Sequence, residues 1–211
     1  MRIAILEDRL ERLNKFLGIG LEAHPEIDVI SGRDFDRIVD ELQNDDAASL
    51  TGYDCIAAHR SALKVNAIAA LKKNSRLTRK PLIFFSGGIT ASVLKEEDFP
   101  FLLINSKDFY SSHLTAFIDD GKQNGHLNLN VLQFGDRWML SLLLNLRNHL
   151  VVGYNNQSIK RVKDGKIPEQ VRQLLAGRAG GLLPDNELAV LSADDVNTLI
   201  RIISQLIIEI A

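Results

Sequence analysis

Several apolar runs of this chain end in side chains that can hold a cation, donate to an anion or exchange a proton. These side chains are Glu7 and Asp8, His59, Ser86, and Asn105 with Lys107. In parallel α/β sheets, ligands bind and chemistry takes place just beyond the carboxyl ends of the strands. If the runs are neighbouring strands, the sequence predicts that these side chains share one site.

The run 55–58 is the most informative of these segments. It is apolar without alternation, which is typical of a strand that is covered on both faces of a parallel sheet. His59 follows it directly, so an ionisable side chain is predicted at the carboxyl end of this strand. The function depends on whether His59 is reactive.

The first part of the chain alternates strand-like and helical patterns. The apolar runs are 2–6, 27–30, 54–58, 81–85 and 101–104. Helical spacing of apolar residues marks the intervening or following segments 9–23, 35–42, 63–73, 91–97 and 110–121. Such alternation indicates right-handed βαβ crossovers and a doubly wound sheet. We therefore predict a flavodoxin-like domain over residues 1–122, with five parallel strands in the order 2-1-3-4-5.

The second part of the chain is predicted to be all-α. A polar, glycine-containing segment at 123–130 is the expected linker, and the helical region covers 131–211. Its helices are predicted over 131–151, 168–176 and 192–210. Pro168 suits a first helical position, Gly177–Asn186 resembles a loop, and Ser192 with Asp195 has the spacing of a capping box.

Composition limits the classes of function. The chain has 211 residues, a formal net charge of -2 and one cysteine. The charge gives no electrostatic basis for broad nucleic-acid binding, and the single cysteine fits a reducing cytoplasm. The sequence shows no secretory signal and no apolar run near the roughly 18 residues of a membrane helix, so we expect no membrane association.

The first domain resembles the receiver domain of bacterial two-component response regulators over Met1–Lys122. In that family, two acids after the first strand hold Mg²⁺ and an aspartate after the third strand accepts a phosphoryl group. A hydroxyl after the fourth strand and a lysine after the fifth complete the site. Glu7, Asp8 and Ser86 match this pattern.

Two positions depart from the receiver pattern. His59 stands in place of the phosphate-accepting aspartate, and Asn105 aligns with the lysine, with Lys107 two residues further on. The resemblance therefore implies a degenerate receiver with weakened Mg²⁺ binding and no bound cofactor. We hypothesise that His59 is partly cationic, pairs with Asp8 or Glu7, and locks the domain in one conformation.

Simpler readings stay open for the same residues. Glu7 and Asp8 could act as helix caps, and Ser86-Gly87-Gly88 could be a turn. His59 could also accept a phosphoryl group itself.

The helical region carries a shorter resemblance, to HEPN-type domains, where an Arg-Asn pair is followed by His-Gly. This resemblance implies an alternative function, an effector that cleaves or binds RNA through the helical region. Arg147, Asn148 and Gly153 match, His149 is displaced to another helical face, and Val152 stands at the position of the general-base histidine. In the alternative reading, Arg147 and Asn148 simply end a helix. A DNA-binding regulator is a further alternative, with a basic cluster at Lys160, Arg161, Lys163 and Lys166.

The favoured reading is a cytoplasmic, bacterial, non-enzymatic module that signals through protein–protein binding. Its expected partner is a kinase, an effector or a second copy in a homodimer, and nucleic acid is not expected. Receivers associate through the last helices and strand, so Phe109, Tyr110 and Tyr154 are candidate contacts. Burial of these side chains against the helical region is the alternative.

Overall fold

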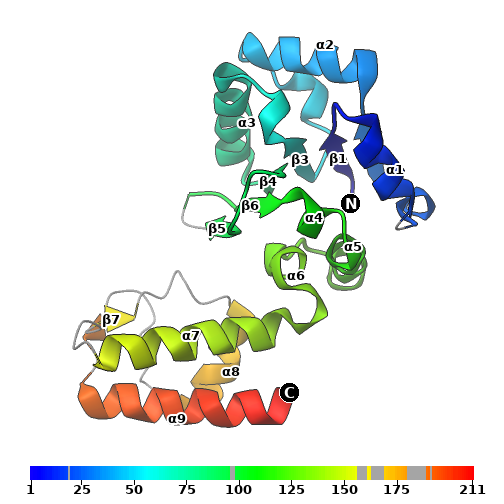
Figure 1. The fold of residues 1–211 in the computed structure, drawn as a ribbon. Helices are drawn as coiled ribbons and strands as arrows, with labels where there is room; N and C mark the ends of the chain where they lie inside the picture. The colour runs from blue at the N-terminus through cyan, green and yellow to red at the C-terminus, as the bar shows by residue number, and fades with distance from the viewer. Residues whose placement is uncertain (19, 96–97, 156–160, 163–168, 180–188, 191) are drawn as a thin grey trace. The chain divides into compact units, whose positions relative to one another are not determined.

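The computed structural model describes all of the chain except residues 19, 96–97, 156–160, 163–168, 180–188 and 191. The chain divides into two compact units, Met1–Asp136 and Arg137–Ala211 (Figure 1). Among the described residues, no helix combines the length and the hydrophobicity needed to cross a bilayer.

A mostly parallel sheet forms the centre of the first unit. In the described residues it has six strands in the order β2-β1-β3-β4-β6-β5, of which only β5 is antiparallel to its neighbour. The strands are β1 (Ile3–Leu6), β2 (Ile27–Ile30), β3 (Cys55–His59), β4 (Leu82–Ser86), β5 (Val93–Lys95) and β6 (Phe101–Asn105). The parallel strands occupy the predicted apolar runs to within about one residue at each end. The α/β class is confirmed, whereas the strand count differs through β5.

The helix predicted over 91–97 is wrong, because Val93–Lys95 forms the strand β5. Val93 pairs with Leu103 and Lys95 with Phe101, so the segment extends the sheet past β6. Only three residues form the strand, and their exposure alternates. Such a segment is too short for its periodicity to be read, and pairing satisfies backbone groups that would otherwise be open along β6.

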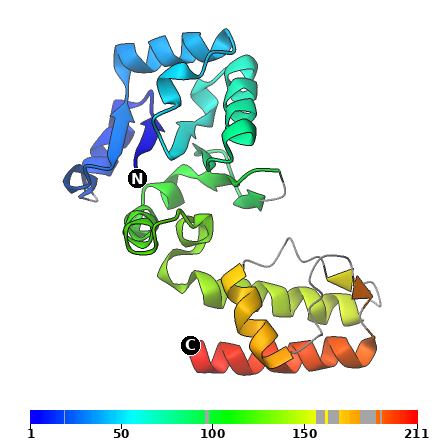
Figure 2. The same cartoon turned by 180° about the vertical axis from the view of Figure 1, so that it is seen from behind.

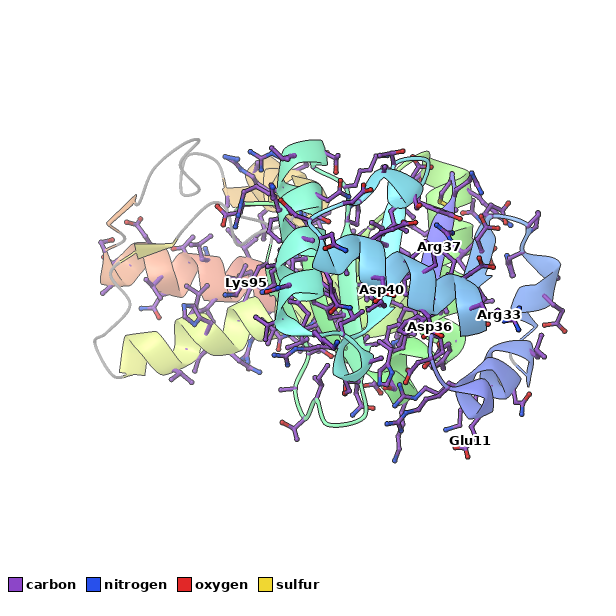
Figure 3. All side chains as sticks on the ribbon, turned by 90° about the horizontal axis from the view of Figure 1, so that it is seen from above. Glu11, Arg33, Asp36, Arg37, Asp40 and Lys95 are labelled. Atoms are coloured by element: carbon purple, nitrogen blue, oxygen red, sulfur yellow. The ribbon has the colours of Figure 1, made fainter. Side chains whose placement is uncertain are left out.

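Helices cover both faces of the sheet. α2 (Gly32–Gln43) and α3 (Val65–Thr78) pack on one face through a core cluster that includes Phe35, Leu71 and Phe84. Charged side chains lie along the exposed side of α2, where Figure 3 labels Arg33, Asp36, Arg37 and Asp40.

Figures 1 and 2 show the later helices of the unit side by side, away from α2 and α3. They are α4 (Ser106–Phe109), α5 (Ser112–Asn124) and α6 (Leu129–Phe134). α1 covers Leu10–Gly18, and 3₁₀ turns occupy Leu21–Ala23, Ala48–Leu50, Arg60–Ala62 and Gly135–Arg137.

The predicted linker at 123–130 and the predicted helix at 131–151 are both revised. α6 buries Leu129, Val131 and Leu132 in the first unit, so this segment belongs to the first core. The helix then breaks at Gly135, which has a φ of 70°. A Cβ there would meet the His113 ring at 2.8 Å, so the break depends on glycine for both conformation and space.

The second unit is mainly helical, as predicted. It contains α7 (Trp138–Asn155), α8 (Glu169–Ala179) and α9 (Ala193–Ile210). Its core includes Leu143, Leu150, Val171, Leu175, Val196, Leu199, Ile203 and Leu206. The capping box of Ser192 and Asp195 at the start of α9 is confirmed.

Two details of the second unit differ from the all-α prediction. β7 (Arg161–Val162) and β8 (Ala189–Val190) form a small antiparallel pair, and two residues are too few to show a strand pattern in a sequence. α8 also continues through Gly177 to Ala179. Pro168 and the segment 180–186 of the predicted loop lie outside the described residues.

Candidate functional site

Strand register brings the candidate residues to one edge of the sheet. Leu6 pairs with Ala58, and Glu7 follows Leu6 directly, so Glu7 lies level with His59 on the adjacent strand. Ser86 and Asn105 pair with each other at the ends of β4 and β6. This arrangement follows from parallel pairing, which aligns the carboxyl ends of neighbouring strands.

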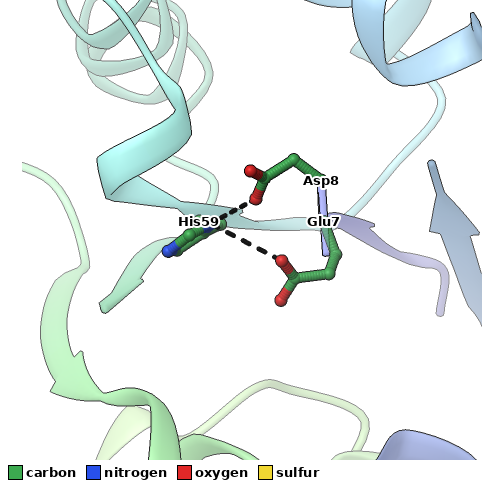
Figure 4. Close-up of side chains that lie close together, drawn as sticks. All are labelled: Glu7, Asp8 and His59. Carbon is green, nitrogen blue, oxygen red and sulfur yellow. Dashed lines mark hydrogen bonds and ion pairs between the residues drawn. The ribbon is translucent and has the colours of Figure 1, made fainter. Parts of the chain in front are cut away.

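Glu7, Asp8 and His59 form a compact cluster at this edge (Figure 4). Nδ1 of His59 forms a short hydrogen bond with Oδ1 of Asp8 and lies 3.5 Å from Oε1 of Glu7. Glu7 and His59 are 0% and 1% exposed, whereas the Asp8 side chain is 32% exposed. The predicted pairing of His59 with the acids is confirmed.

Two hydrogen-bond donors and one guanidinium surround the buried Glu7 carboxylate. The backbone N–H of Arg9 donates to Oε1 at 3.1 Å, and the Tyr110 hydroxyl donates to Oε2 at 2.9 Å. Nη1 of Arg12 lies 3.7 Å from Oε2. Burial raises the pKa of Glu7 above its ordinary value, although these donors act in the opposite direction. These contacts offset the free-energy cost of burying a carboxylate at this position.

Burial also lowers the pKa of His59, because it disfavours the imidazolium more than the hydrogen bond to Asp8 favours it. Burial therefore opposes the cationic form that the sequence predicts for His59, while Nδ1 is hydrogen-bonded to the Asp8 carboxylate. Burial is the largest influence on Asp8 and acts to raise its pKa, but the interactions with His59, together with hydrogen bonds with Glu7 and the backbone, outweigh it and the pKa is lowered. Asp8 is the charged acceptor of this pair.

An aromatic column, formed by Phe85, Phe109 and Tyr110, packs against the His59 ring. The His59 ring stacks on Phe85 with centroids 5.8 Å apart, and Phe85 stacks on Phe109 at 4.3 Å. Tyr110 meets both phenylalanine rings edge-on. Phe109 and Tyr110 are 0% and 7% exposed. These two predicted surface contacts are therefore buried in the first unit, while the side chain of Tyr154 lies outside the described part.

The remaining predicted site residues have other partners. Oγ of Ser86 is hydrogen-bonded to Oγ of Ser61 at 2.6 Å. The Asn105 amide donates to the carbonyl of Ile89 at 2.6 Å, and its oxygen accepts from the backbone N–H of Lys107 at 2.8 Å, capping α4. The Lys107 side chain is exposed. Asn105 thus stabilises loops rather than replacing the charge of a lysine.

Two residues of the site were missed by sequence reasoning. Arg12 follows the acid pair by one helical turn, a spacing that could have indicated its return to Glu7. Its guanidinium also approaches Gly87 in the loop after β4. Tyr110 is far from Glu7 in the sequence, and no local pattern could have shown that its hydroxyl donates to that carboxylate.

The HEPN-like segment lies within α7 and makes a structural contact. Nε of Arg147 donates to Oγ of Ser204 on α9 at 2.7 Å. Asn148 and His149 are exposed, as is Val152 at 58%. α7 continues to Asn155, so the helix does not end at Arg147 and Asn148, and Gly153 lies within it.

The basic cluster falls mostly outside the described residues: only Arg161, in β7, is described, and Lys160, Lys163 and Lys166 are not. Comparison of the chain with protein-family models, with curated proteins and with solved structures finds no match, so no family assignment follows.

Proposed function

We propose that the first unit is a receiver-like, flavodoxin-like signalling module that takes no phosphoryl group and acts by binding another protein. The observation that carries this proposal is His59 at the end of β3, with Nδ1 bonded to Asp8. The order of the parallel strands, β2-β1-β3-β4-β6, supports the receiver-like fold, with β6 as its fifth strand and β5 as an addition.

Phosphoryl transfer to a receiver needs a carboxylate nucleophile, a metal ion and donors for the phosphoryl oxygens. His59 takes the place of the nucleophile and engages Asp8, one of the two acids that would hold the metal. Asn105 stands at the lysine position and is occupied by the loop after β4. His59 therefore removes the nucleophile and occupies a metal-binding acid, and Asn105 removes the cationic donor.

The His59–Asp8 hydrogen bond also fixes a conformation. It ties the segment after β1 to the end of β3, and the rings of Phe85 and Phe109 hold the imidazole in place. A receiver changes its binding surface when phosphate arrives, whereas this module presents one surface constitutively. Its partner is a kinase, an effector or a second copy of the chain.

Acetyl phosphate labelling with Mg²⁺ tests the proposal. Intact-mass spectrometry should detect no added phosphoryl group, and the molar mass by light scattering should be the same with and without acetyl phosphate. Stoichiometric phosphorylation would contradict the proposal. If the added group disappeared in a His59→Asn variant, the imidazole itself would be the acceptor.

A further inference from the structure

The same cluster has the donor set of a metal site. Two carboxylate oxygens and one imidazole nitrogen, from Glu7, Asp8 and His59, lie within 4.8 Å of one another. In the described part of the chain, no other group of three or more His, Cys, Asp or Glu side chains brings its ligand atoms this close together.

The geometry suits a small ion. Two ligands that are each bonded at about 2.1 Å to a tetrahedral ion are roughly 3.4 Å apart. Nδ1 of His59 and Oε1 of Glu7 are 3.5 Å apart. Oδ1 of Asp8 is hydrogen-bonded to Nδ1, and the Asp8 side chain is partly exposed, so it has room to rotate and admit an ion.

Neighbouring groups orient the ligands in advance. Tyr110 and Arg12 both contact Oε2 of Glu7, and Oε1, which also accepts from the backbone N–H of Arg9, faces Nδ1 of His59. Hydrogen bonds to a ligand carboxylate, such as those from Tyr110 and Arg9, raise the affinity of metal sites. The positive charge of Arg12 repels a bound metal ion, but Arg12 lies beside Oε2 of Glu7, whereas Oε1 faces His59. Asp8 opens the cluster to solvent, so water can complete the coordination.

We propose that Glu7, Asp8 and His59 bind a divalent first-row transition metal ion, such as Zn²⁺, in preference to Mg²⁺. An imidazole ligand suits Zn²⁺ and its neighbours in the first transition row, whereas Mg²⁺ prefers oxygen ligands alone. The ion takes the place of the proton between Nδ1 of His59 and Oδ1 of Asp8. This inference goes beyond the binding role of the module and does not depend on it.

Calorimetric titration of the full chain, stripped with a chelator and dialysed, tests the site. Zn²⁺ should bind with one equivalent, Co²⁺ should give a visible absorption band, and Mg²⁺ should give no saturable heat. Asp8→Asn keeps the shape of a partly exposed side chain and should weaken Zn²⁺ binding at least about tenfold, the smallest loss expected when even a supporting group is removed. His59→Asn should do the same.

An exposed histidine provides the matched control. His149 lies on α7, and His149→Ala should leave the Zn²⁺ affinity unchanged. The inference is overturned if Asp8→Asn, shown to be folded by circular dichroism, binds Zn²⁺ as tightly as the unaltered chain. It is also overturned if the unaltered chain shows no saturable Zn²⁺ binding or binds Mg²⁺ equally well. Acetyl phosphate labelling reports on the proposed function separately.

Discussion

A His59→Asp variant is expected to lose about 3–5 kcal/mol of unfolding free energy when no metal is present, the usual cost of an uncompensated buried charge. His59 donates to Asp8 and lies 3.5 Å from Oε1 of the fully buried Glu7. Aspartate would remove the donor and add a third carboxylate. Three carboxylates suit a hard cation, so Mg²⁺ at about 100 times its Kd should restore about 2.7 kcal/mol.

Urea unfolding followed by far-UV circular dichroism, with and without Mg²⁺, measures both effects. His59→Asn is the matched control, because it has the size of aspartate without the charge and should gain nothing from Mg²⁺. Trp138, the one tryptophan, lies in the second unit, so its fluorescence gives an internal reference. Equal stability of His59→Asp and the unaltered chain without Mg²⁺ would show that His59 does not compensate the buried acids.

Replacing Phe85 by alanine should cost the first unit about 3–5 kcal/mol of unfolding free energy, as for other large-to-small changes in cores. Phe85 is fully buried and contacts the rings of His59, Phe109 and Tyr110. Loss of the phenylalanine ring leaves a cavity beside the imidazole, and His59 then loses the surface that holds it against Asp8.

Urea unfolding also measures this change, with Leu77→Ala as the control. Leu77 is 76% exposed on α3, so its truncation should stay within about 0.5 kcal/mol of the unaltered chain. A loss below about 1 kcal/mol for Phe85→Ala would mean that the aromatic column does not support the cluster.

The parallel strands could be predicted because each is a short, non-alternating apolar run between helical patterns. The run that ends at His59 is the clearest, and β3 lies within one residue of its predicted bounds. β5 and the β7–β8 pair could not be predicted, since two or three residues carry no measurable period. The helix break at Gly135 could not be predicted because apolar residues continue at helical spacing on both sides of it.

The cluster itself could be predicted because strand order and register follow from the fold. The direction of the His59 pKa could not, since two neighbouring acids favour a cation, whereas burial, which lowers the pKa, depends on the tertiary fold. Tyr110 illustrates a second limit. Its place in an apolar helical pattern indicated packing, but the donation of its hydroxyl to Glu7 depends on the tertiary fold.

Titration of ¹⁵N-labelled protein with Mg²⁺ and then beryllofluoride, followed by NMR, tests most directly whether His59 has replaced receiver chemistry at this site. Beryllofluoride imitates a phosphoryl group on a carboxylate, so a working receiver would respond to it. We predict no saturable shifts at the amides of Glu7, Asp8, His59 and Ser86. Saturable shifts at these amides with Mg²⁺ and beryllofluoride would contradict the proposal.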